Sequence, residues 1–170
     1  MLLSRSYHKG FSLVEVLISI IIMVIIVTIA IPSFTSFTKS SRVDTAYNEL
    51  FFMFQYAKSE ALKRKETVVV CNSSDGRSCI SNGLEWAAEK IIAKIDSGDQ
   101  AQTVLRVITL NNKDVLIKPT ISTIEFLGSG ELEKDNKVTV ESKDCQVPKM
   151  GVISINKMGL ITNKAGECSA

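Results

Sequence analysis

The chain has 170 residues, of which 45% are hydrophobic and 22% are charged, with 20 basic and 18 acidic side chains. This length suits one ordinary domain with an appendage and excludes a large multidomain enzyme. The near balance of charge argues against a protein that wraps nucleic acid through bulk charge. The single histidine, His8, lies within the first ten residues. Without that segment the chain has no imidazole for a Ser-His-Asp triad, a Cys-His centre or a His-bearing zinc site.

A long apolar run follows this N-terminal segment. Residues 11–31 contain one charged side chain, Glu15. As a helix the run would be about 31 Å long, which matches the hydrocarbon core of a bilayer. A cleaved signal peptide has a shorter apolar run, and the core helix of a small soluble domain is rarely apolar on every face. We therefore predict a transmembrane helix. Because Arg5 and Lys9 precede it, we expect a cytoplasmic N-terminus and export of the rest.

The start of the apolar run carries a family resemblance. A short basic peptide, residues 1–9, is followed by Gly10, by Phe11 and by an apolar helix with Glu15 near its start, and Pro32 follows the run. This pattern resembles the leader and first helix of type IV pilins. The resemblance implies that a prepilin peptidase cuts after Gly10 and methylates the new amine of Phe11. It also implies that Glu15 and Pro32 serve assembly.

Two interpretations of Glu15 are open. An acidic residue costs about 2.5–3.5 kcal/mol at the centre of a membrane helix and less near an interface, so Glu15 could simply stay hydrated near the headgroups. The pilin resemblance implies instead that Glu15 pairs with the methylated amine of Phe11, on its own chain or on a neighbour. In pseudopilus tips the outermost subunit resembles the others but lacks this carboxylate. The presence of Glu15 therefore predicts a position below the tip.

The helical pattern continues beyond the apolar run. One predicted face is apolar, at spacings of one, three and four residues: Val43, Ala46, Tyr47, Leu50, Phe54, Ala57 and Ala61. The opposite face is polar: Arg42, Asp44, Asn48, Glu49, Lys58 and Glu60. We interpret the apolar face as packing on the chain's own domain and not as a partner groove. Because proline removes one helical hydrogen bond, Pro32 predicts a bend in a single helix from Phe11 to about Lys65.

After Lys65 the pattern changes to short β-prone runs separated by turn residues. The clearest predicted strands are residues 67–71, 103–108, 122–126, 138–140 and 152–155. Turn residues occupy 72–76, 111–114, 128–130 and 157–159. Residues 84–96 are ambiguous between helix and strand, and their position between strands favours a strand. We predict an α+β chain of the type IV pilin fold, in which a long N-terminal helix with a transmembrane first half packs on a small antiparallel β domain.

These boundaries predict four segments. Residues 1–10 form a prepilin leader peptide, and residues 11–31 form a transmembrane and assembly helix. Residues 32–64 continue that helix in amphipathic form. Residues 65–170 form a periplasmic β-rich globular domain.

A second resemblance lies in the β-rich part. Residues 59–71 with Asp75 and Gly76, residues 124–126 with Gly128 and Gly130, and a Cys-flanked C-terminal hairpin are similar to FimT/FimU-type minor pilins and GspH pseudopilins. The resemblance implies a low-abundance subunit that primes or caps a type IV pilus. Its implied partners are prepilin peptidase and other minor and major pilins or pseudopilins. The subunit would first lie in the inner membrane with its globular domain in the periplasm, and after assembly it would lie in a pilus or pseudopilus fibre. The alternative is a minor pseudopilin of a type II secretion system.

Four cysteines lie in the part expected to be exported, at positions 71, 79, 145 and 168. In an oxidising compartment an even number predicts two disulfides, for which three pairings are possible from sequence alone. The Cys-flanked loops favour local pairing, Cys71–Cys79 and Cys145–Cys168. A zinc site is disfavoured because there is no Cys-x-x-Cys pair and no available histidine.

The remaining sequence offers no catalytic, metal or cofactor site. Acidic pairs such as Glu131 and Glu133 alternate with other polar residues in the manner of a solvated surface. A DNA-uptake minor pilin is a further, weaker alternative. That branch has a basic tail with a Gly-Arg-x-Arg segment, whereas both arginines are absent from residues 159–162. With 13 basic and 14 acidic residues in 65–170, nucleic acid binding is not expected, and Lys157 and Lys164 are only weak candidates.

Overall fold

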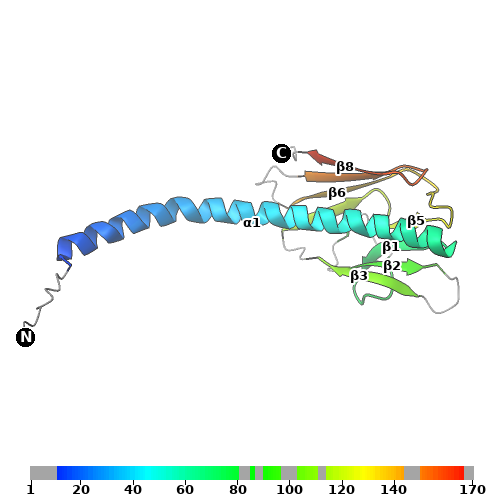
Figure 1. Cartoon of the computed structure of the whole chain (residues 1–170), viewed down its shortest axis with the longest axis horizontal. Coiled ribbons are helices and arrows are strands. Elements are labelled where there is room, and N and C mark those ends of the chain that lie inside the picture. The colour runs from blue at the N-terminus through cyan, green and yellow to red at the C-terminus, as the bar shows by residue number, and fades with distance from the viewer. Residues whose placement is uncertain are drawn as a thin grey trace, which may run out of the picture. The chain divides into compact units, whose positions relative to one another are not determined.

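The computed structural model describes residues 11–80, 85–86, 90–96, 103–110, 114–143 and 150–166. The elements in chain order are α1 (Leu13–Arg64), β1 (Val68–Ser73), β2 (Lys90–Ile95), β3 (Val104–Thr109), β4 (Val115–Pro119), β5 (Thr123–Phe126), β6 (Asn136–Ser142), β7 (Met150–Ile155) and β8 (Ile161–Gly166). The chain divides into two units, Met1–Phe37 and Thr38–Ala170. The first unit holds the start of α1. The second holds the rest of α1 and all eight strands (Figure 1).

In the first unit α1 is exposed throughout and mostly apolar. Every residue from Phe11 to Phe37 is exposed, and the helix is continuous through Pro32. Hydroxyl groups bond back to carbonyls one turn earlier: Thr35 Oγ1 lies 2.9 Å from the Pro32 carbonyl oxygen. Such bonds satisfy the hydrogen-bonding needs of hydroxyl side chains within the helix itself. The bend expected at Pro32 stays a prediction.

In the second unit the eight strands form two antiparallel sheets of four strands each. The first sheet has the order β3-β2-β1-β5, and the second has the order β4-β6-β7-β8. The register places Val70 opposite Ala93 and Ile124 in the first sheet, and Val138 opposite Ile153 in the second. Strands of the two sheets lie on opposite sides of the second part of α1 in Figure 1. This confirms the predicted antiparallel fold and resolves it into two sheets.

The core of this unit lies between the helix and the sheets. Residues Val43, Ala46, Leu50, Met53, Phe54, Ala57 and Ala61 of α1 are buried. The Phe54 ring lies 6.3 Å from the Trp86 ring, and the Trp86 indole nitrogen donates a hydrogen bond to the Ser122 carbonyl oxygen at 3.0 Å. Truncating a large side chain in such a core costs about 2–5 kcal/mol. The predicted apolar face of the helix therefore packs on the chain's own sheets.

Two residues of the helix depart from the predicted faces. Tyr47 is only partly buried and packs at the edge of the core. Glu60, expected on the polar face, is 9% exposed. Its carboxylate accepts a hydrogen bond from Arg64 Nε at 2.6 Å, and this bond holds the pKa of Glu60 below its usual value. Glu60 can lie close to the core because a basic partner one turn away compensates its charge.

Close approach of the backbone explains a glycine in each of two places. A Cβ at Gly151 would lie 2.2 Å from an atom of the Tyr47 ring, so this ring could not keep its present place on β7. Gly159 has φ of +72°, and a Cβ there would lie 2.0 Å from the Gly130 carbonyl oxygen. Only glycine fits both demands at low cost. These contacts hold the β7–β8 turn against the turn after β5.

The predicted strands agree with the structure in five places, at β1, β3, β5, β6 and β7. The ambiguous run contains β2, but Glu85 and Trp86 belong to no strand. Of the two further strands, β4 was not predicted, and β8 was implied only by the resemblance to a C-terminal hairpin. β4 ends in Pro119, and β8 is largely polar and exposed. Both are edge strands, where proline and polar residues are tolerated because one side needs no ladder partner.

Candidate assembly surfaces

The first candidate surface is the exposed start of α1. By length and composition α1 can cross a membrane, and its most apolar window has no buried residues. The exposed apolar surface of this helix includes isoleucine, leucine and valine side chains, most of which expose roughly half of their area or more. Ile21, for example, is 51% exposed and Ile29 is 70% exposed. So much contiguous apolar surface is unfavourable in water and needs lipid or other helices around it.

Glu15 lies at the beginning of this helix, where it also makes a local bond. The backbone nitrogen of Ser12 donates to Glu15 Oε2 at 3.3 Å. This is one half of a capping box, in which a glutamate at the third position of the helix accepts a hydrogen bond from the backbone nitrogen of the residue just before the helix. The carboxylate also lies at the positive end of the helix dipole. The Ser-x-x-Glu spacing at residues 12–15 could have revealed this second role from sequence.

The two processing residues lie on either side of the boundary of the described chain. Gly10 falls outside the described residues, so cleavage after it stays a prediction. Phe11 is 84% exposed and precedes the first residue of α1.

The second candidate surface is a disulfide-closed loop after β1. Cys71 and Cys79 are bonded, with 5.5 Å between their Cα atoms. This pairing is the one the sequence favoured. Cys71 is fully buried in β1, and the loop between the two cysteines is mostly exposed. The predicted Cys145–Cys168 pair lies outside the described residues.

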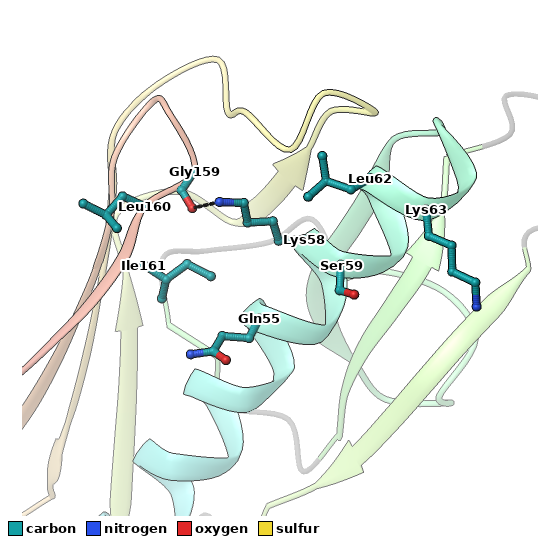
Figure 2. Close-up of a pocket in the computed structure, with 8 residues that line it drawn as sticks. All are labelled: Gln55, Lys58, Ser59, Leu62, Lys63, Gly159, Leu160 and Ile161. Atoms are coloured by element: carbon teal, nitrogen blue, oxygen red, sulfur yellow. Dashed lines mark hydrogen bonds between the residues drawn. The ribbon is translucent and has the colours of Figure 1, made fainter.

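The third candidate surface is a groove between α1 and the β7–β8 turn, which we call the helix–turn groove. It has a volume of about 600 Å³ and is lined by Gln55, Lys58, Ser59, Leu62, Lys63, Gly159, Leu160 and Ile161 (Figure 2). Lys58 Nζ donates to the Gly159 carbonyl oxygen at 2.7 Å, which joins the helix to the turn. The sequence places Lys58 on the polar face of the helix and gives no sign of the groove. No local sequence signal could have shown it, because its two walls lie about 100 residues apart in the chain.

The weak nucleic-acid candidates do not form a basic site. Lys157 lies in the β7–β8 turn and Lys164 lies within β8, and both are exposed. The Lys157 backbone nitrogen donates to Asp135 Oδ1 at 2.6 Å, so a carboxylate lies beside this turn. Within the described part of the chain, no group of three or more His, Cys, Asp or Glu residues could hold a metal ion.

A helix that is apolar and exposed in its first part and packed on antiparallel sheets in its second defines a type IV pilin-like subunit. Two family models match this sequence: the type II transport protein GspH model over residues 46–159, and the prokaryotic N-terminal methylation motif over residues 5–31. Because the GspH model spans more than half of the sequence, the chain belongs to the GspH family of type II transport proteins. No curated protein matches the chain.

Solved structures with the same fold come from two systems. The type IV minor pilin FimU of Pseudomonas aeruginosa strain PAO1 is 21% identical, with a TM-score of 0.58 over 78% of this chain and 99% of that one. The minor pseudopilin EpsH from the Type 2 Secretion System of Vibrio cholerae is 11% identical, with a TM-score of 0.55 over 73% of this chain and 97% of that one. At these identities the likeness establishes the fold.

Proposed function

We propose that this chain is a minor subunit of a type IV pilus that primes or caps assembly through its N-terminal helix. The observation that carries the proposal is the unbroken exposure of residues 11–37, with a single carboxylate at Glu15. A structural role of this kind needs no catalytic residue and no cofactor.

The apolar helix suits two environments in succession. Before assembly, lipid surrounds residues 11–31 in the inner membrane, and the globular domain of residues 65–170 lies in the periplasm. In the fibre, helices of other pilins replace the lipid. Prepilin peptidase would first cut after Gly10 and methylate Phe11, which places a positive amine near Glu15. Residues 32–64 join the two parts, with Pro32 at the point where the helix leaves the membrane.

A minor pseudopilin of a type II secretion system is the second candidate function. The GspH family model and the likeness to EpsH support it, and the likeness to FimU supports the pilus in similar measure. Deleting the gene separates the two. Loss of piliation or twitching with normal exoprotein secretion supports the pilus, whereas the reverse result supports secretion.

The test of the assembly role is substitution of Glu15. We expect Glu15→Ala and Glu15→Leu to leave cleavage after Gly10 and membrane insertion intact. Co-purification with partner subunits and fibre number should fall about tenfold or more, because a hydrogen bond to a charged group contributes about 1.5–3 kcal/mol. Quantitative immunoblots of affinity-purified complexes and fibre counts by electron microscopy measure both effects.

The Glu15→Gln variant separates charge pairing from helix capping. Glutamine keeps an oxygen acceptor for the Ser12 backbone nitrogen but cannot attract a cationic amine. If pairing with the methylated amine matters, this variant assembles as poorly as Glu15→Ala. Normal assembly of all three variants would refute the proposed role of Glu15.

A further inference from the structure

The helix–turn groove has apolar walls that no described part of the chain covers fully. Leu160 is 58% exposed and Leu62 is 38% exposed. Phe52 lies one turn before Gln55 on the same side of α1 and is 59% exposed, so the apolar character continues along the helix. In Figure 2 the Leu62 side chain stands on the helix and the Leu160 side chain stands on the turn, with the Lys58–Gly159 hydrogen bond between them.

The charge of the groove is one-sided. Two lysines line it, Lys58 and Lys63, and none of the lining residues is acidic. Lys63 is 74% exposed at its side chain and lies 3.7 Å from Glu60, whose carboxylate already binds Arg64. An ammonium group has three donors, and the bond from Lys58 to Gly159 uses one. The groove therefore presents apolar side chains beside an excess of positive charge.

Position and chemistry decide which occupant suits the groove. A lipid surface is disfavoured because the groove begins at Gln55, roughly 25 Å along the helix from Thr38, where the second unit starts. Nucleic acid is disfavoured because residues 38–170, which include both walls, have nearly balanced charge, with 18 basic and 17 acidic side chains. The walls also include Leu62, Leu160 and Ile161, which offer a phosphate no donor. A protein segment that combines large apolar side chains with a carboxylate matches both properties of the groove.

We infer that the helix–turn groove is a docking site for an acidic, apolar segment of a neighbouring pilin-type subunit. This inference rests on the proposed function and names the surface through which the globular domain would meet its neighbour. Apolar side chains of the partner would pack on Leu62 and Leu160, one on each side of the Lys58–Gly159 bond. A carboxylate next to these side chains would face Lys63 at the rim.

Photocrosslinking in cells tests the inference with the full chain. The photoreactive residue p-benzoyl-phenylalanine is placed at position 160, and in a matched control at position 158. Met158 is 79% exposed on the same turn but does not line the groove. We expect a crosslink from position 160 to another pilin-type subunit, mapped by mass spectrometry to a segment with Asp or Glu beside large apolar residues.

A charge reversal provides the second measurement. Lys63→Glu should lower the crosslink yield from position 160 about threefold to tenfold, because a like charge now faces the carboxylate of the partner. Lys157→Glu reverses an exposed lysine outside the groove and should change the yield less than about twofold. Both lysines are on the surface, and circular dichroism checks that the variants stay folded.

The contrary outcomes are equally definite. Equal crosslinking from positions 158 and 160 overturns the inference. The absence of any crosslink from position 160 also overturns it. A crosslink from that position to lipid, to nucleic acid, to a second copy of this chain or to a segment without a carboxylate would overturn it as well. If these occur while Glu15→Ala still abolishes co-purification, the groove fails and the proposed function stands. If Glu15→Ala also has no effect, the proposed role of Glu15 fails as well, and gene deletion without loss of piliation would refute the proposed function itself.

Discussion

Asp75 accepts four hydrogen bonds within the disulfide-closed loop. Its Oδ2 accepts from Ser78 Oγ at 2.6 Å, and its Oδ1 accepts from the Arg77 and Ser78 backbone nitrogens at 2.7 and 2.9 Å. Ser73 Oγ donates to the same Oδ1 at 3.0 Å. The bond from the Ser78 hydroxyl contributes most to holding the pKa of Asp75 far below its ordinary value of 3.8. One carboxylate thus organises the loop that follows β1.

The depressed pKa of Asp75 predicts a pH-dependent contribution to stability. The charged form is favoured in the folded chain, so the contribution is complete above the unfolded pKa of 3.8 and is lost as the pH falls toward the folded value. We expect Asp75→Ala to lower the melting temperature of the detergent-solubilised chain at pH 7 and to lower it less at pH 3. Circular dichroism melts measure the difference.

Ser74→Ala is the control for this prediction, because Ser74 is exposed in the same loop. It should leave the melting temperature nearly unchanged at both values of pH. A difference between wild type and Asp75→Ala that stays constant or grows at low pH would contradict the prediction.

At the scale of elements, a disulfide and a backbone hydrogen bond together hold the end of β1. β1 lies between β2 and β5, and all six of its residues are buried. The Cys71–Cys79 disulfide closes the loop that follows β1. The Ile80 backbone nitrogen also donates a hydrogen bond to the Asn72 carbonyl oxygen at 2.8 Å. The disulfide restricts the unfolded chain, whereas the backbone bond stabilises the folded loop.

Removing the disulfide should therefore destabilise the domain without changing its fold. The chain-entropy model gives a loss of about 2.6 kcal/mol for a loop of this length. The double variant Cys71→Ala with Cys79→Ser should show this loss in denaturant unfolding, and the reduced wild type should lose at least as much, because reduction would also open the predicted Cys145–Cys168 bond. Unchanged stability in both samples would show that the disulfide contributes nothing measurable.

At the scale of the whole molecule, the charge distribution sets what the globular domain can bind. The 13 basic and 14 acidic side chains of residues 65–170 leave no net positive field. Lys157 and Lys164 belong to different parts of the β7–β8 hairpin, and no arginine occupies residues 159–162. Affinity for duplex DNA depends mainly on neutralising phosphates, so such a surface offers little.

We accordingly expect no gel shift of duplex DNA by micromolar detergent-solubilised chain near physiological salt. Lowering the salt should restore at most weak binding without sequence preference. A clear shift at physiological salt that is abolished by Lys157→Ala with Lys164→Ala would overturn this expectation and favour the DNA-uptake alternative.

Local patterns in the sequence determined much of this protein. The apolar run of residues 11–31, the leader pattern around Gly10 and Glu15, and the helical spacing from Val43 to Ala61 each lie within one segment, so composition and periodicity suffice to show them. Five strands are predictable for the same reason, because runs of β-branched and apolar residues favour strands. The pairing of Cys71 with Cys79 was favoured because the two residues flank one short loop.

Tertiary structure alone decided the rest. The edge strands β4 and β8 pair with β6 and β7, although β4 ends in Pro119 and β8 consists largely of weak strand formers. Glu60 is largely buried although it is charged, and its carboxylate is paired with Arg64 one turn along the helix. The helix–turn groove joins Lys58 to Gly159 across about 100 residues of chain, and only packing brings such distant segments together. Contacts of this kind depend on the sum of many packing energies and leave no local mark in the sequence.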